Sequence, residues 1–432
     1  MISFFGKLWR NNRGNTLAIA AACLPLFVGA AGLASDTIQW TMWKRQLQRA
    51  ADSAAIAGVY NRENAAGATT TTSSAVSHDL SLNLHTFYSL KTGFPQVSFP
   101  ANSGALTNQV SVSVAIQQPL SFSSFFLSTA PTILAASTAA SIPSGGEACI
   151  NARETSASQT GINITGSAGI YMPDCVMYSN SPSTNSAAAG GSSAVTAEAV
   201  AGVGGIQQSS NWNVQSYRPY SPPIDDPFAN VTPAPSNMNC TSTALTDRTT
   251  TIASGVNCFS SLSVGSNRTL NLDTLFGSGA TIYVNGGDAT IQGNLTCSSC
   301  TIVLTNQSTA TSATIGQFKS NAGANVNMTS PTTGTYKGIA IYQDRRAVDG
   351  GSTNKINGNN NSIIQGALYF PSQQLDYNGD GTTTAVCTMF VARRINFSGN
   401  NTTTNKFKKL SDCSAYGFPG GTSVTRMVRL VA

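Results

Sequence analysis

Residues 14–35, GNTLAIAAACLPLFVGAAGLAS, contain no charged side chain, and this run constrains the fold more than any other feature of the chain. As a helix the run would extend about 33 Å at about 1.5 Å per residue, enough to cross a hydrocarbon core of about 30 Å. Lys7, Arg10 and Arg13 precede it and small residues close it, as in a secretory signal peptide. The run alone leaves two interpretations open: a leader that is removed, or a transmembrane helix that stays.

The residues that follow predict that the helix continues beyond the membrane. No Gly or Pro interrupts residues 36–57, and apolar or small side chains recur there at spacings of three and four. This predicted packing face consists of Trp40, Trp43, Leu47, Ala50, Ala54 and Ala57. Small residues let another element approach closely, and that element is either part of the same domain or a helix of a partner. Both alternatives stay open.

The same residues resemble the N-terminal segment of the TadE/TadG-like Flp pilus-assembly family, in its TadG-like branch. The matching pieces are Arg13-Gly14-Asn15, an Ala-rich run with Pro25 inside it, Gly32–Asp36 at its exit, and the Ala-rich tail Gln48–Gly58. In that family the helix is a retained anchor, so the resemblance implies retention. It also implies a pilin-like α+β unit and other pilus-assembly proteins as partners.

One departure from related prepilins concerns processing. Prepilins that a prepilin peptidase cuts carry a Gly at the cut and a Glu at the fifth mature position. Gly14 is present, but the fifth residue after it is Ile19. We therefore expect neither cleavage at Gly14 nor assembly as a pilus subunit.

Cysteine usage indicates the compartment. Three basic residues precede the apolar run and three follow it closely, so the positive-inside rule does not decide orientation. Cys23 lies in the run, and the other cysteines, all in the polar C-terminal part, predict disulfides in an oxidising compartment. They are Cys149, Cys175, Cys240, Cys258, Cys297, Cys300, Cys387 and Cys413. Eight cysteines allow 105 pairings; pairing of sequence neighbours is our guess. The layout predicts an inner-membrane protein with a cytoplasmic N-terminus and a periplasmic C-terminal bulk.

The fold class that we expect is α+β. A second helix is expected near residues 73–90 and strands near 108–121 and 132–142, whereas helical patterns almost vanish after residue 146. Short β runs with Asn and Gly then predict an irregular right-handed β-helix or β-solenoid, with a β-sandwich as the competitor. The expected domains are a TadG-like anchor and pilin-like unit (1–145), a first β-rich segment (146–220), a Pro-rich linker (221–235) and a β-helix-like domain (236–432).

Two short motifs carry weak chemical signals. In DYNGDG, Asp376, Asn378 and Asp380 match the start of a calcium loop. The twelfth position is Cys387 instead of Glu, so an acidic turn is the competing interpretation. The Cys297–Cys300 pair lies between predicted strands, which favours a structural disulfide over a redox site.

Charged side chains could also form a glycan-cleaving groove. The candidates are Lys337, Asp344, Arg345, Arg346, Asp376, Arg393 and Arg394, and nothing in the sequence fixes their mutual distances. No basic cluster has the form of a nucleic-acid module, and no motif indicates a cofactor or a particular small-molecule ligand.

The sequence thus favours a non-enzymatic, membrane-anchored component of Flp pilus or tight-adherence assembly with a periplasmic β-rich interaction domain. The alternative is a membrane-tethered β-helix that binds or cleaves polysaccharide.

Overall fold

The structure is a computed structural model that describes residues 15–350, 353–357, 362–378, 386–399, 405–418 and 424–431. The chain forms two compact units, and each is described by itself. The first comprises the chain up to Ile142 together with the short segment from Val428, and the second comprises Pro143–Met427.

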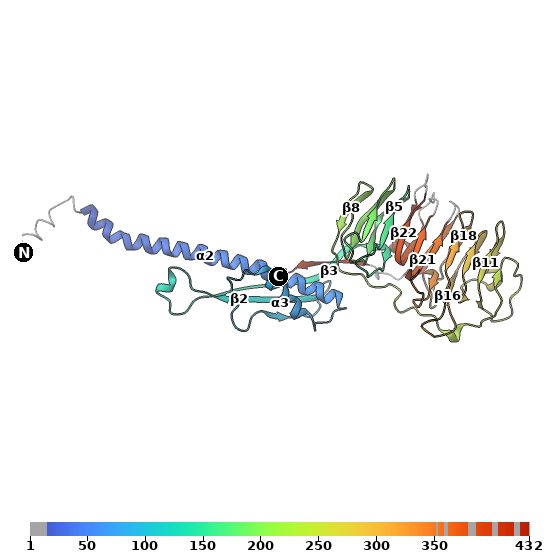
Figure 1. Ribbon diagram of the computed structural model, residues 1–432, viewed down its shortest axis with the longest axis horizontal. Coiled ribbons are helices and arrows are strands. Elements are labelled where there is room, and N and C mark those ends of the chain that lie inside the picture. Colours follow the sequence, from blue (N-terminus) through green and yellow to red (C-terminus); the bar gives the residue numbers. More distant parts are fainter. Residues whose placement is uncertain are drawn as a thin grey trace, which may run out of the picture. The chain divides into compact units, whose positions relative to one another are not determined.

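A single long helix, α2 (Asn15–Asn64), begins the described chain (Figure 1). Leu24, Leu26 and Phe27 in its N-terminal part are exposed, whereas the part from Trp43 onward is buried on one side. Among the residues that the structure describes, α2 is the one helix long and apolar enough to cross a membrane. The expected continuity of the apolar run with the helix after it is confirmed, and Pro25 lies inside the helix.

The rest of the first unit is a small α+β arrangement. Helix α3 (Thr72–Asn83) and an antiparallel sheet of β1 (Gln96–Ser98), β2 (Thr107–Gln117) and β3 (Thr132–Ala152) pack beside α2. Val110, Val112 and Val114 alternate along β2 and turn toward the helices, as the period of two requires. The 3₁₀ turn η1 (Ser123–Phe125) lies in the loop between β2 and β3. β3 is longer than expected, because it continues to Ala152.

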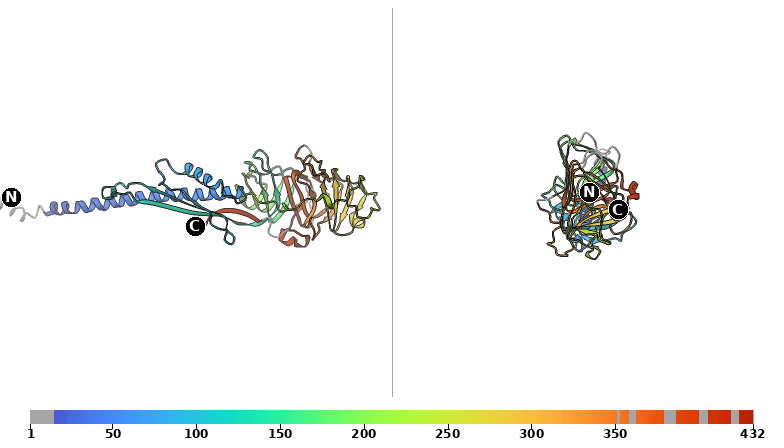
Figure 2. Two further views of the ribbon diagram at one scale, coloured as in Figure 1. Left: turned by 90° about the horizontal axis from the view of Figure 1, so that it is seen from below. Right: turned by 90° about the vertical axis from the view of Figure 1, so that its right-hand side faces the viewer.

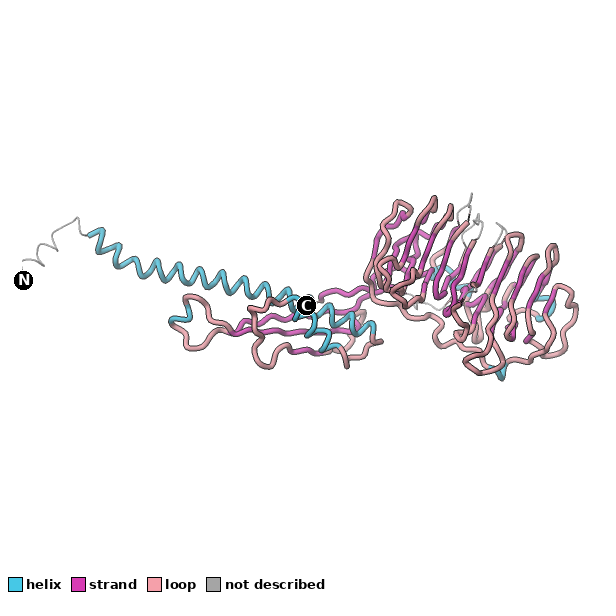
Figure 3. The backbone as a smooth tube through the Cα atoms, viewed as in Figure 1, coloured by secondary structure: helices cyan, strands magenta, loops and turns pink. Residues whose placement is uncertain are grey.

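The second unit consists almost entirely of short strands (Figure 3). Its first strands are β4 (Ile162–Ile164), β5 (Gly169–Ser179), β6 (Ala187–Ala189), β7 (Ala194–Gly202) and β8 (Trp212–Arg218). After η2 (Pro235–Asn237) come β9 (Leu245–Thr246), β10 (Cys258–Phe259), β11 (Leu262–Val264), β12 (Thr269–Asn271), α4 (Leu272–Phe276), β13 (Ala280–Asn285), β14 (Ala289–Ile291), β15 (Asn294–Cys297) and β16 (Cys300–Thr305). The last elements are β17 (Phe318–Ser320), β18 (Asn325–Thr329), β19 (Ile339–Gln343), β20 (Asn354–Ile356), β21 (Ile363–Tyr377), β22 (Thr388–Phe397), β23 (Asn405–Lys406), η3 (Leu410–Tyr416) and β24 (Val424–Leu430).

From β10 to β18, these strands form parallel ladders in which each strand pairs with the strand three further along the chain, whereas β4, β5 and β19 pair with the strand two further along. One ladder runs β10–β13–β16–β19, a second β11–β14–β17–β20 and a third β12–β15–β18–β21. Side chains of one kind therefore stack from layer to layer. The Tyr342 and Tyr369 rings stack with centroids 5.0 Å apart, and the Asn325 amide donates to Asn294 at 2.8 Å. In such in-register ladders, buried amides hydrogen-bond to the amides of the next layer and aromatic rings stack on one another.

The order of strands in the stack differs from their order in the sequence. β22 pairs in parallel with β21 on one side and with β3 and β4 on the other. Phe390 of β22 thus lies between Leu368 and Ile150. The early strands β3–β8 and the late strands β9–β22 form one stack, with residues 147–152 near its middle. Figure 1 shows β8, β5, β22, β21, β18 and β11 in this order along the stack, and β3 pairs with both β5 and β22.

The segment 221–235, expected as a linker, runs along this stack and is bonded to successive layers. The Tyr178 hydroxyl donates to the Pro222 carbonyl, the Asn180 amide donates to the Ile224 carbonyl at 2.8 Å, and the Tyr342 hydroxyl donates to Val231 at 2.8 Å. We call this segment the strap. It carries the chain from the β8 end of the stack toward the β9 end.

Four disulfides join sequence neighbours in the second unit. They are Cys149–Cys175, Cys240–Cys258, Cys297–Cys300 and Cys387–Cys413, and Cys23 in α2 is free. The first joins β3 to β5, and the third joins β15 to β16.

Candidate functional site

The packing face of α2 is the first candidate site, and most of it is buried within the first unit. Trp43, Leu47, Ala50 and Ala54 are buried, and they share one core with Val76 and Leu80 of α3 and the valines of β2. Two residues of the expected packing face are not fully buried. Ala57 is only half-buried, and Trp40 is 41% exposed. Of the two alternatives for this face, the structure describes packing on its own domain.

Four further residues of α2 belong to the buried face: Ala51, Ala55, Gly58 and Val59. Gly58 marks the closest approach, since a Cβ there would lie 2.8 Å from Val110 Cγ1 and 3.1 Å from Val76 Cγ2. The paired alanines at 50–51 and 54–55 were the available signal: successive helical residues are 100° apart, so adjacent small residues indicate a wide contact face.

Asp36, at the exit of the apolar run, binds the loop between β2 and β3. Its buried carboxylate accepts hydrogen bonds from Phe122 N at 2.8 Å, from Ser123 N at 2.6 Å and from the Ser123 hydroxyl. Gln39 accepts from the Ser121 hydroxyl at 3.0 Å. These bonds attach η1 to α2, so the exit motif has a structural role that its spacing alone did not reveal.

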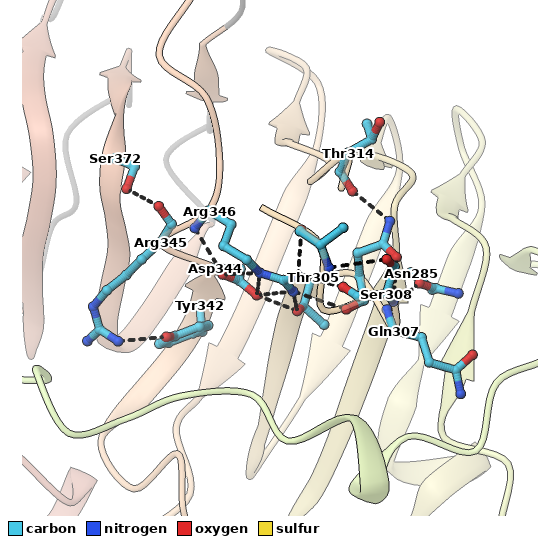
Figure 4. A network of polar contacts seen from close by, with 12 residues as sticks. Asn285, Thr305, Gln307, Ser308, Thr314, Tyr342, Asp344, Arg345, Arg346 and Ser372 are labelled. Carbon is cyan, nitrogen blue, oxygen red and sulfur yellow. Dashed lines mark hydrogen bonds and ion pairs between the residues drawn. The ribbon is translucent and has the colours of Figure 1, made fainter. Parts of the chain in front are cut away.

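Five of the seven charged residues proposed for a glycan groove belong to three networks in the second unit. In the first, Arg346 and Asp344 pair at 2.8 Å, and Asp344 accepts from the Thr305 hydroxyl at 2.7 Å (Figure 4). Arg346 also donates to backbone carbonyls of the loop after β16, including Asn306 O at 3.0 Å. Burial raises the pKa of Asp344, but the bonds from Arg346 and Thr305 outweigh burial and hold that pKa below its usual range.

Arg345 points away from Asp344 in Figure 4 and binds the strap. Its guanidinium donates to Val231 O at 2.7 Å and lies 3.6 Å from the Asp226 carboxylate and 5.3 Å from the Tyr369 ring centre. The Tyr369 hydroxyl donates to Asp226 at 2.7 Å. This second network therefore fastens the strap across β19 and β21.

The third network lies where β22 meets β3. Glu154, whose side chain is fully buried, pairs with Arg393 at 3.0 Å and with Arg394 at 2.7 Å, and both arginines also pair with Asp349. Burial raises the pKa of Glu154, but hydrogen bonds from Arg393, Ser156 N and Arg394 outweigh burial and lower that pKa from 4.5 to about 2. We call these four charged residues the junction cluster.

These networks leave Asp344 poorly suited to acid catalysis, and the same holds for Glu154, which was not among the candidates from the sequence. A general acid must hold its proton near neutral pH, whereas Glu154 and Asp344 have lowered pKa values and arginine partners. Lys337 is exposed, and Asp376 accepts from Thr353 Oγ1 at 2.9 Å and from the Gln374 amide at 2.7 Å. An open hollow of about 560 Å³ lies elsewhere in the unit, with uncharged lining residues that include Tyr283 and Tyr336.

The calcium motif is only partly described. Asp376 and Asn378 lie at the end of β21, where Asn378 donates to the Asn357 side chain at 2.8 Å, and Asp380 lies outside the described residues. Within the described ranges, no three His, Cys, Asp or Glu residues gather closely enough to hold a metal ion. Calcium binding by this motif stays a prediction.

The packing face gives a prediction about stability. Ala54→Leu places three additional heavy atoms in the α2 core and should lower the free energy of unfolding by roughly 1–3 kcal/mol through overpacking. Arg49→Leu, on the exposed side of the same helix, should stay within about 0.5 kcal/mol of wild type. Thermal unfolding of the detergent-solubilised full chain by circular dichroism measures both. Equal behaviour of the two variants would contradict the assignment.

The junction cluster gives a prediction about acid sensitivity. Because the folded-state pKa of Glu154 lies below 4.5, its ion pairs stabilise fully above about pH 4.5 and lose effect as pH falls toward 2. Glu154→Gln should lower the free energy of unfolding by about 3 kcal/mol at pH 7. It should also weaken the dependence of that free energy on pH between about 4.5 and 2. Asp288→Asn removes the exposed pair with Lys319 and should cost less than about 1 kcal/mol. Urea unfolding at several pH values tests this, and an unchanged acid profile in Glu154→Gln would count against it.

Comparison with known proteins gives one match. Residues 14–68 match the family model described as "Putative Flp pilus-assembly TadE/G-like". No curated protein and no solved structure matches the chain. The matched residues cover α2 with its apolar run and its packing face. They confirm the resemblance found in the sequence: residues 14–68 are similar to the TadE/G-like Flp pilus-assembly family.

Proposed function

We propose that this chain is a non-enzymatic, single-span component of Flp pilus or tight-adherence assembly. The observation that carries the proposal is the match over residues 14–68, which joins a run able to cross a membrane to a helix packed into a folded unit. The uninterrupted helix that joins the apolar run to the core of the following domain supports retention of the run. The helix therefore acts as a retained anchor.

The second unit is, in this proposal, a periplasmic interaction domain with a β-helix architecture. Parallel pairing at intervals of three strands supports a three-sided coil, and parallel crossovers favour the right hand. Four disulfides support an oxidising compartment for this unit. In the proposal, the N-terminus lies in the cytoplasm and α2 crosses the inner membrane. Its partners would be other pilus-assembly proteins.

Topology and retention are testable together. After alkaline extraction of cell membranes, the full-length chain should remain in the pellet, with an intact mass that includes residues 14–35. Alkylation of the denatured but unreduced protein should reach Cys23 alone, and reduction should expose the other eight cysteines. A mature N-terminus after residue 30, or several free thiols before reduction, would contradict the anchor and the compartment respectively.

Participation in pilus assembly needs a separate experiment. Chemical crosslinking in cells, followed by purification of the chain, should recover other pilus-assembly proteins. A matched variant keeps an unrelated spanning sequence in place of residues 14–35, so it stays in the membrane without the family's own anchor. Absence of any pilus-assembly protein from the wild-type material would contradict the proposal, whereas its loss in the variant alone would assign the contact to the anchor.

A further inference from the structure

The loop between β2 and β3 exposes a cluster of large apolar side chains within the first unit. Phe125 is 82% exposed, Phe126 74% and Leu127 53%. We call residues 118–131 the hairpin tip. Such an exposed cluster on a protein surface marks a contact with a partner or a membrane.

The hairpin tip is fixed beside the place where the apolar run of α2 ends. Asp36 and Gln39 hold Ser121, Phe122 and Ser123 by hydrogen bonds. The Phe122 ring lies directly over the Cα of Gly32, where any side chain would collide with it. Figure 2 shows the loop alongside α2, toward the N-terminal end of that helix.

The composition of this region also suits a lipid environment. Residues 92–146 contain no Asp, Glu, Lys, Arg or His, so no charge would lose its hydration if the tip entered the headgroup layer. Beside the tip, Leu33 and Ile38 of α2 are exposed as well. At the base of the hairpin, the Lys91 ammonium donates to Thr132 Oγ1 at 3.1 Å and can face anionic headgroups.

We propose that the hairpin tip is a second membrane contact, with Phe125, Phe126 and Leu127 inserted into the boundary between headgroups and acyl chains. Phe and Leu are typical of protein segments that bury an apolar face at that boundary. The occupant of this surface is the lipid bilayer itself, because Gly32 and Asp36 place the tip at the level where α2 leaves the apolar run. The contact rests on the proposed membrane anchoring of α2, and it would fix the rotation and tilt of the first unit on the membrane.

The test uses the full chain in vesicles of phosphatidylcholine and phosphatidylglycerol, with no other protein present. Cys23→Ala removes the free thiol, and Phe125→Cys then carries an environment-sensitive nitrobenzoxadiazole label. Ser103→Cys is the matched control, because it is exposed and lies in the same uncharged stretch but in the loop before β2. Lipids with a nitroxide near the headgroup quench a label that reaches them.

We expect blue-shifted emission and strong quenching at position 125, and water-like, unquenched emission at position 103. Flotation of the same vesicles reports separately whether the chain is anchored. Anchored protein with a water-exposed label at 125 would overturn the inference while leaving the proposed function intact, and it would assign the tip to a protein partner. Protein that fails to float would overturn both.

Discussion

The pairing of β22 with β3 and β4 is the interaction on which the second unit depends. Together with the pairing of β23 with β5, it joins the strands before the strap to the strands after it, and without it the facing edges of β3, β4 and β22 would be unpaired. The junction cluster lies at this seam, where Glu154 and Asp349 together neutralise the positive charges of Arg393 and Arg394, and the Glu154 carboxylate is buried from water. The Coulomb attraction is strong there because burial weakens screening, and the backbone bonds from Thr155 and Ser156 satisfy the remaining oxygen.

The first unit depends on the close approach of α2 to β2 more than on the area of the side chains buried between them. Ala50, Ala54 and Gly58 carry almost no side chain, so α2 lies near enough to β2 for the valines of the strand to fill the space between them. The same helix is exposed and apolar at its other end. One helix thus combines an exposed apolar part with a part packed into a protein core. Asp36 lies between these two parts of α2, and the hairpin tip donates hydrogen bonds to its carboxylate.

The sequence predicted elements whose signal is local and missed those that depend on distant partners. An uncharged run and a small-residue face lie within single stretches, so α2 and most of its buried face could be predicted. Ala57 was assigned to that face by the alternation of steps of three and four, but such a pattern drifts by about 20° every seven residues, so Ala57 lies off the line through Leu47, Ala51, Ala54 and Gly58. The pairing of Glu154 with Arg394, 240 residues later, leaves no periodic trace, so Arg394 could be named as a candidate whereas Glu154 was missed. The strap was recognised as a connection by its prolines, but its hydrogen bonds to successive layers have no sequence signature.

The strand order has a consequence for biosynthesis. A chain that emerges from the N-terminus first presents β3 to β8 long before β22 exists, so the edge that β22 will cover stays open while the strap and the later strands are made. Contacts of such high sequence separation form slowly, and unpaired parallel edges invite association with other chains. Completion of this unit is therefore tied to delivery of almost the whole polypeptide, and a chain cut short before β22 would carry two uncovered edges in place of none at the seam.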